Sequence, residues 1–282
     1  MKRYKIGLYE KAMPSDMSWK EKMKCAKECG YDYIEMCIDA TEEKIQRVYM
    51  EEIAVQELVC MMHETKMPIQ SMSISALTKY ALGDENNVIR ARGEEILSRA
   101  IDLAARLGIR TVMVPGYDIY YGHSSQKTRR LFLENVKKMA ERASMQGVLI
   151  GFETMENEFM NTVGKALYYV DLIDSPYLKV YPDIGNLTNA AVLYKQNVSE
   201  DIEQGKGKII SFHLKETLPG QFREVPFGTG HVDFAKAIKT AWSIGVRRYV
   251  TELWCIDDEW KENIQVAYNM MKGILEKQKA VF

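Results

Sequence analysis

Eight short apolar runs alternate with segments of helical periodicity, and this alternation constrains the fold of the 282-residue chain more than any other feature. The runs are continuous rather than alternating apolar and polar, which is typical of parallel strands covered on both faces. They span residues 5–9, 33–36, 69–74, 111–114, 148–153, 178–183, 208–213 and 248–252. Strands that alternate with helices predict an α/β fold with a parallel sheet.

The helical segments carry a recurring stop signal. Four of them end at a glycine directly before the next strand, as expected of a helix C-terminus that turns back to a sheet. They are 19–29 before Gly30, 85–107 before Gly108, 128–146 before Gly147 and 234–244 before Gly245. A further segment, 259–277, predicts a closing helix. With eight strands and no GxGxxG fingerprint, the sequence favours a single (β/α)8 TIM barrel over 1–282.

Composition excludes several classes of protein. The formal net charge is −1, so no basic field favours nucleic acid. No apolar stretch approaches membrane-spanning length, and the N-terminal one is too short for a signal peptide. Five cysteines without a CxxC pair argue against a disulfide framework or a thiolate zinc site. We expect a cytoplasmic protein with neither nucleic-acid nor membrane partners.

Four potential metal ligands follow the last four apolar runs: Glu153, Asp183, His213 and Glu252. A parallel barrel brings the carboxyl ends of all its strands to one mouth, so these side chains are expected to converge. Three carboxylates and one imidazole are suited to a single divalent cation such as Mn²⁺, Zn²⁺, Co²⁺ or Mg²⁺. Each residue alone could equally cap a helix; the interpretation depends on all four together.

Several motifs together resemble one family, the L-ribulose/L-xylulose 5-phosphate 3-epimerases of the xylose-isomerase-like barrel superfamily. The resemblance runs nearly the whole length and is carried by segments 4–12, 116–121, 181–187, 213–215, 225–230 and 232–234. It implies a homodimer or higher oligomer that moves a proton at C3 of a ketopentose phosphate. It also implies that Glu153 and Glu252, besides binding metal, act as the acid/base pair.

The loop after the third strand departs from that family. Its members commonly have Ser-Ala-His followed by basic residues, whereas this chain has Leu77, Thr78 and Lys79 after Ser75 and Ala76. An imidazole and a cation that would help to hold substrate are therefore missing. The exact sugar, and whether it must carry phosphate, stay open.

The chemistry itself points to the same two glutamates. Epimerisation beside a ketone removes a weakly acidic proton, and a Lewis-acidic cation would stabilise the charge of the resulting enediolate. Two carboxyl groups on opposite faces of the sugar would take one proton and return another. Glu153 and Glu252 fit because their strands are separated around the mouth. Which of them is the base for which epimer stays open.

Other polar residues at the strand ends are candidate substrate contacts, each with an ordinary structural alternative. Arg223 and Lys215 are candidates for phosphate or a hydroxyl group, and Lys79 lies in the divergent loop. Asn186 could equally cap a helix, and Glu156 could be merely solvated.

The resemblance thus implies a sugar-phosphate 3-epimerase that interconverts L-xylulose 5-phosphate and L-ribulose 5-phosphate. An aldose–ketose isomerase and a 3-epimerase of unphosphorylated ketoses remain alternatives with the same metal and carboxylate geometry. A catalytically inactive sugar-binding barrel is an alternative of another class. A DNA-repair endonuclease on this barrel is disfavoured because the chain has only four histidines and no basic groove.

Overall fold

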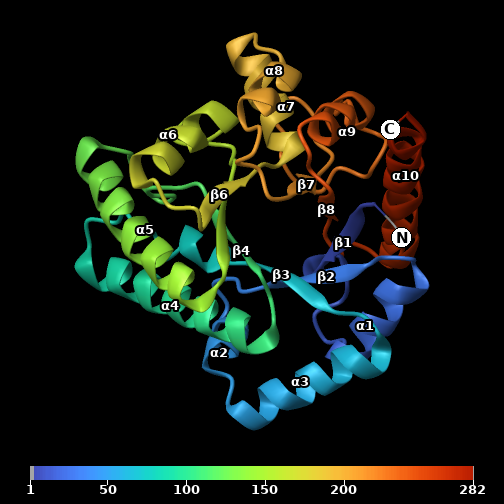
Figure 1. The fold of residues 1–282 in the computed structure, drawn as a ribbon, viewed down its shortest axis with the longest axis horizontal. Helices are drawn as coiled ribbons and strands as arrows, with labels where there is room; N and C mark the ends of the chain where they lie inside the picture. The colour runs from blue at the N-terminus through green and yellow to red at the C-terminus, as the bar shows by residue number, and fades with distance from the viewer. Residues whose placement is uncertain (1–2, 282) are drawn as a thin grey trace.

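The computed structural model describes residues 3–281 as a ring of eight strands enclosed by helices (Figure 1). All neighbouring strands pair in parallel, in the order β6-β5-β4-β3-β2-β1-β8-β7, which confirms the predicted barrel. The strands are β1 (Lys5–Tyr9), β2 (Tyr33–Cys37), β3 (Ile69–Ser73), β4 (Thr111–Pro115), β5 (Leu149–Glu153), β6 (Leu178–Tyr181), β7 (Phe212–Leu214) and β8 (Arg248–Thr251). The predicted domain extent of 1–282 stays a prediction, and residues 1, 2 and 282 lie outside the described range.

Helices form the outer layer of the molecule (Figure 1). They are α1 (Trp19–Glu28), α2 (Glu42–Gln46), α3 (Glu52–Thr65), α4 (Asn87–Leu107), α5 (Gln126–Gln146), α6 (Val163–Ile173), α7 (Ile184–Tyr194), α8 (Val198–Gln204), α9 (Phe234–Ser243) and α10 (Trp260–Val281). Short 3-10 turns follow β1 (η1, Glu10–Ala12), α2 (η2, Arg47–Tyr49) and β3 (η3, Ser75–Thr78). In residues 3–281, no helix combines the length and apolarity needed to cross a bilayer.

The predicted glycine stops appear as left-handed residues at the ends of α1, α4, α5 and α9. Their φ values are 97° at Gly30, 74° at Gly108, 66° at Gly147 and 99° at Gly245. Glycine adopts positive φ without the steric penalty of a Cβ atom, so these positions reverse the chain directly into the next strand.

The barrel wall is least regular between β6 and β7. These two strands meet only through isolated bridges, one joining Val180 to Ile209 and the other joining Asp183 to His213. The backbone N–H of His213 donates to Pro182 O at 2.9 Å across this junction. The sheet is therefore nearly closed, and its seam lies between two of the strands that carry predicted ligands.

Two predicted strands are shorter than the apolar runs suggested. In the run 178–183 the regular strand ends at Tyr181, because Pro182 has no N–H to donate and Asp183 begins the next helix as its N-cap. The run 208–213 becomes a strand only at Phe212. Its first residues touch β6 through the isolated bridge at Ile209.

The barrel interior is filled by a small apolar cluster that is separate from the main core between sheet and helices. Its members come from strands all around the barrel: Tyr9, Tyr33, Cys37, Met113, Tyr181 and Val250. Side chains that point inward from a parallel barrel fill it in layers, so it is a packed core rather than a pore. This layer supports the polar residues at the strand ends.

Candidate metal centre

The four predicted ligands converge at the carboxyl ends of the last four strands. Glu153 ends β5, Asp183 caps α7 directly after β6, His213 lies in β7, and Glu252 follows β8. One ligand atom from each lies within 4.8 Å of the other three, and all four residues are buried. We call these four residues the metal centre.

His213 connects two sides of this arrangement. Its Nδ1 lies 2.9 Å from Glu153 Oε1 and 3.0 Å from Glu252 Oε2. Its Nε2 lies 2.5 Å from Glu35 Oε1, a carboxylate of β2 that crosses the barrel interior. Burial alone would lower the pKa of His213, but Glu35 and the two glutamates of the metal centre raise that pKa well above its usual value.

Lys215 supplies a second positive charge beside the carboxylates. Its Nζ lies 3.3 Å from Asp183 Oδ1 and 3.6 Å from Glu252 Oε2. Burial would lower the pKa of Lys215, but Asp183 and Glu252 raise it above its usual value. Lys215 therefore stays charged and partly neutralises the metal centre.

The three carboxyl groups of the metal centre have different environments. Burial raises the pKa of Asp183 to about 8, although Lys215 opposes that shift. Burial also raises the pKa of Glu153. At Glu252 burial acts in the same direction, but Lys215 and His213 outweigh it and hold the pKa below its usual range. Opposite shifts in two neighbouring carboxyl groups are typical of acid/base sites.

The residues present fit a divalent cation. Asp183 Oδ1 accepts a hydrogen bond from the backbone N–H of Asn186, but Oδ2 is buried and has no hydrogen-bond partner among residues 3–281. A buried acceptor without a donor is unfavourable unless another group satisfies it. Hard oxygen donors with one imidazole match Mn²⁺, Zn²⁺, Co²⁺ or Mg²⁺.

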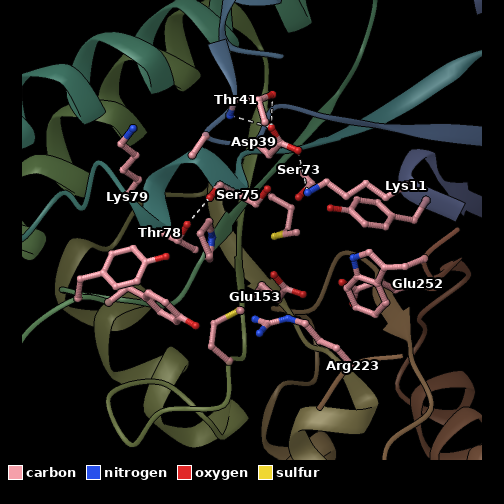
Figure 2. Close-up of a pocket in the computed structure, with 18 residues that line it drawn as sticks. Lys11, Asp39, Thr41, Ser73, Ser75, Thr78, Lys79, Glu153, Arg223 and Glu252 are labelled. Carbon is pink, nitrogen blue, oxygen red and sulfur yellow. Dashed lines mark hydrogen bonds and ion pairs between the residues drawn. The ribbon is translucent and has the colours of Figure 1, made fainter. Parts of the chain in front are cut away.

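A cavity of about 610 Å³ opens above the metal centre. Glu153 and Glu252 both line it, together with an apolar wall that includes Tyr9, Met155 and Trp254. In Figure 2 Glu153 lies near the middle of the cavity, with Glu252 on one side and Lys79 on the opposite side. The volume is in the range of small-molecule sites.

Polar groups line the rest of the cavity wall. Hydroxyl groups come from the β2–α2 loop, β3 and η3: Thr41, Ser73, Ser75 and Thr78. The cations are Lys11, which pairs with Asp39 at 2.8 Å, and two residues predicted from sequence, Lys79 and Arg223. Hydroxyl groups and cations of this kind are suited to a polyhydroxylated or anionic ligand.

The predicted substrate contacts fall into two groups. Arg223 and Lys79 line the cavity, and Arg223 is joined to Glu156 by an ion pair of 3.0 Å. Lys79 has no carboxylate within ion-pair distance in the described part of the chain, and its Nζ lies 5.2 Å from the centre of the Tyr80 ring. These two cations are therefore placed where a ligand phosphate could reach them.

Asn186 and Lys215 do not line the cavity. Asn186 is buried, and its Nδ2 donates to Thr154 O at 2.8 Å. The cap of α7 is Asp183, which accepts from the backbone of Asn186, so the helix-capping alternative for Asn186 was wrong. Lys215 is buried and contacts Asp183 and Glu252. Both residues buttress the carboxylates rather than face the open cavity.

Sequence reasoning missed Glu35. It lies within the apolar run Tyr33-Ile-Glu-Met-Cys37, every residue of which is buried. A charged residue inside a fully buried strand is a signal that sequence alone offers, because such a group requires a partner. The position of that partner, His213, on the far side of the barrel is not visible in the sequence.

Comparisons with known proteins agree with this geometry. The model of the xylose isomerase-like TIM barrel family matches residues 23–273. The putative L-ribulose-5-phosphate 3-epimerase SgbU of Escherichia coli (strain K12) is 38% identical over 261 residues, with 90% of each chain covered. The L-ribulose-5-phosphate 3-epimerase UlaE of Escherichia coli (strain SE11) is 37% identical over 254 residues, which cover 90% of this chain and 88% of that protein. A solved L-ribulose 3-epimerase superposes with a TM-score of 0.79 at 18% identity, covering 98% of this chain and 96% of the other.

Proposed function

This chain belongs to the xylose isomerase-like TIM barrel family, with L-ribulose-5-phosphate 3-epimerases among its relatives, and from that premise we propose that it is a metal-dependent sugar-phosphate 3-epimerase. As an enzyme it is an isomerase that acts on carbohydrates. The substrate pair we propose is L-xylulose 5-phosphate and L-ribulose 5-phosphate, because the relatives are named for L-ribulose 5-phosphate.

The observation that carries the proposal is the placement of two glutamates on one cavity. Glu153 and Glu252 come from β5 and β8, and both line the space in which a sugar would lie. One carboxylate takes the proton from C3, and the electron pair of the C–H bond moves towards the C2 carbonyl oxygen. The other carboxyl group then returns a proton to C3 on the opposite face as the electron pair moves back.

A divalent cation is part of the proposal. Glu153, Asp183, His213 and Glu252 are the residues that would hold it, and when bound it supplies Lewis-acid stabilisation of charge at the carbonyl oxygen. Lys215 orients Asp183 and Glu252 through its ion pairs with both. The apolar wall with Trp254 limits access of water to the reacting carbon.

The distribution of cations supports a phosphorylated substrate. Lys79 lies on the side of the cavity opposite Glu252, so a ketose with its C2–C3 end at the glutamates would extend its phosphate towards Lys79 (Figure 2). Asn186 and Lys215, which do not line the cavity, act on the substrate only through the carboxylates they support.

The test is a substrate screen with a positional readout. Purified enzyme is incubated with L-xylulose 5-phosphate, L-ribulose 5-phosphate, pentulose and hexulose phosphates, and the free sugars, in deuterated water, and the products are identified by NMR. Deuterium at C3 supports epimerisation, whereas deuterium at C1 or C2 with an aldose product supports the isomerase alternative. Binding without turnover of any sugar would favour the inactive sugar-binding barrel. Elemental analysis of the purified protein identifies the metal.

We also propose a homodimer or higher oligomer in the cytoplasm, as the resemblance implies. Size-exclusion chromatography with light scattering measures the oligomer directly. A monomer at micromolar concentration would contradict that part of the proposal.

A further inference from the structure

We propose that Glu35 is a positioning residue that fixes the ring of His213 with Nδ1 directed at the metal centre. The inference rests on the proposed function, because it concerns how the metal ligand is held. Glu35 lies on β2, whereas the four ligands lie on or directly after β5 to β8.

The contacts of Glu35 use both of its carboxylate oxygens. Oε1 lies 2.5 Å from His213 Nε2, and Oε2 accepts a hydrogen bond from the Tyr181 hydroxyl at 2.8 Å. The side chains of Glu35 and His213 are both fully buried, at 0% exposure. The Tyr181 ring also packs against the imidazole, with ring centroids 5.0 Å apart. Tyr181 thus contacts both the Glu35 carboxylate and the His213 ring and helps to fix their relative positions.

The chemistry of imidazole explains what this contact does. A neutral imidazole has one N–H and one bare nitrogen, and only the bare nitrogen can bind a metal. A cation bound at the metal centre would displace the proton of the nitrogen that faces it, and Glu35 beside Nε2 would keep the other proton there. This leaves Nδ1, which lies 2.9 Å from Glu153 Oε1, as the ligand atom. Such carboxylate partners also increase the basicity of a ligand histidine.

Burial argues against a purely packing role. Glu35 is fully buried, and its partner Tyr181 belongs to the apolar cluster of the barrel interior, where an apolar side chain of similar size would avoid the desolvation of a carboxylate. Its partners are a potential metal ligand and a tyrosine, with no Lys or Arg in ion-pair contact among residues 3–281. The Glu35 carboxylate therefore acts chiefly on His213.

The test measures metal affinity rather than turnover. Metal-free wild type, Glu35→Gln and Glu35→Leu are titrated with Mn²⁺ by isothermal titration calorimetry, and circular dichroism verifies that each variant is folded. We expect the Kd for Mn²⁺ to rise about 10–100-fold in Glu35→Leu and less in Glu35→Gln, whose amide oxygen can still accept from Nε2. The visible spectrum of bound Co²⁺ should change in Glu35→Leu, because the orientation of a ligand changes.

A control variant tests whether the effect comes from the position of Glu35 beside His213 or from the loss of any buried carboxylate. Glu216 is another buried carboxylate, but its oxygens accept from the backbone N–H groups of Gly228 and Val232, and it does not contact His213. Glu216→Gln should leave the Kd and the Co²⁺ spectrum unchanged.

Three results would differ from this expectation. If wild type binds Mn²⁺ and both folded Glu35 variants bind it within about twofold of wild type, the positioning role is overturned while the proposed function stands. If Glu35→Leu does not fold, Glu35→Met, which also lacks an acceptor oxygen for Nε2, decides by the same criterion. If wild type itself does not bind Mn²⁺, Co²⁺ or Zn²⁺, the metal dependence in the proposed function fails, and this inference fails with it.

Discussion

Two clusters of buried charge lie at the mouth of the barrel, and they are built in opposite ways. The acidic cluster consists of the metal centre with its neighbours: Glu35, Glu153, Asp183, His213, Lys215 and Glu252. The cationic cluster consists of Glu10, Lys22, Lys44 and Arg47. In the first, four carboxyl groups face two basic groups; in the second, one carboxylate faces three cations.

The difference between them lies in how completely the polar atoms are satisfied. In the cationic cluster, Glu10 Oε1 accepts from Lys22, Lys44 and Arg47 at 2.6–3.0 Å. Its Oε2 accepts from Arg47 and from the backbone of Cys37. In the acidic cluster, Asp183 Oδ2 has no partner in the described residues. A cluster satisfied from within is a structural device, whereas one that leaves an acceptor open is suited to receive a ligand.

The largest expected difference is in catalysis. Glu153→Gln or Glu252→Gln should lower kcat by about 10²–10⁴-fold, because an amide cannot exchange the C3 proton. Kinetics on L-ribulose 5-phosphate measure this, with Glu216→Gln as the buried-carboxylate control. Unchanged kcat in either variant would end the assignment of that glutamate.

The second expected difference is in the free energy of unfolding. A substitution in the cationic cluster should lower it, and one in the acidic cluster should raise it. Glu10→Gln should lower the free energy of unfolding by about 3–5 kcal/mol, because it leaves three buried cations without their carboxylate. Glu153→Gln in the metal-free protein should raise it by about 1 kcal/mol, because it removes the cost of burying a carboxylate. Urea unfolding measures both. The same sign in both variants would contradict the division into structural and ligand-binding clusters.

Metal removal is expected to affect only the acidic cluster. Chelation should abolish activity, and Mn²⁺, Co²⁺ or Zn²⁺ should restore it. Metal at about 100 times its Kd should raise the free energy of unfolding by about 2.7 kcal/mol. Thermal or urea unfolding with and without metal measures the increment, which Glu10→Gln should retain and Asp183→Asn should lose. Full activity in the metal-free enzyme would refute the metal requirement.

Acidification should weaken the cationic cluster. Burial would raise the pKa of Glu10, but Arg47, Lys22 and Lys44 outweigh burial and hold that pKa well below its usual range. A depressed pKa stabilises the fold above the unfolded-state value of about 4.3, and the stabilisation is lost as the pH falls further towards the folded-state value. The stability difference between wild type and Glu10→Gln should therefore shrink by roughly 3 kcal/mol between pH 5 and pH 2. A constant difference across that range would mean that Glu10 does not titrate with the fold.

The smallest expected effect concerns the phosphate. Lys79→Ala and Arg223→Ala should each raise KM about tenfold for phosphorylated ketoses, which corresponds to the loss of one charge-assisted hydrogen bond. KM for the free ketoses should change much less. Because Glu156 neutralises Arg223, we expect the larger effect from Lys79. Equal effects on phosphorylated and free sugars in both variants would reject a phosphate role for these cations.

The barrel was predictable from sequence because each of its local signals acts over a few residues. Apolar runs and glycine stops such as Gly108 are decided within one helix and one strand. The convergence of Glu153, Asp183, His213 and Glu252 was also predictable, because the geometry of a parallel barrel brings strand ends together whatever the side chains. Whether these residues perform the proposed chemistry stays a prediction.

The features that were not predicted depend on contacts between residues far apart in the sequence. Glu35 and His213 are 178 positions apart, and Glu10 meets Arg47 across 37 positions. No local pattern specifies such pairs, so the positioning carboxylate and the cationic cluster were not predicted. The late start of β7 is a further case, because the direction of 208–211 is decided by a bridge to β6.

The seam between β6 and β7 has a mechanical consequence. Asp183 lies on one side of that junction and His213 on the other, and a regular ladder of backbone hydrogen bonds does not join them. A ligand bound to both residues would link β6 to β7 and would slow local opening of the barrel wall at this point. Amide hydrogen exchange of 178–183 and 208–214 would then report occupancy of the site independently of any sugar.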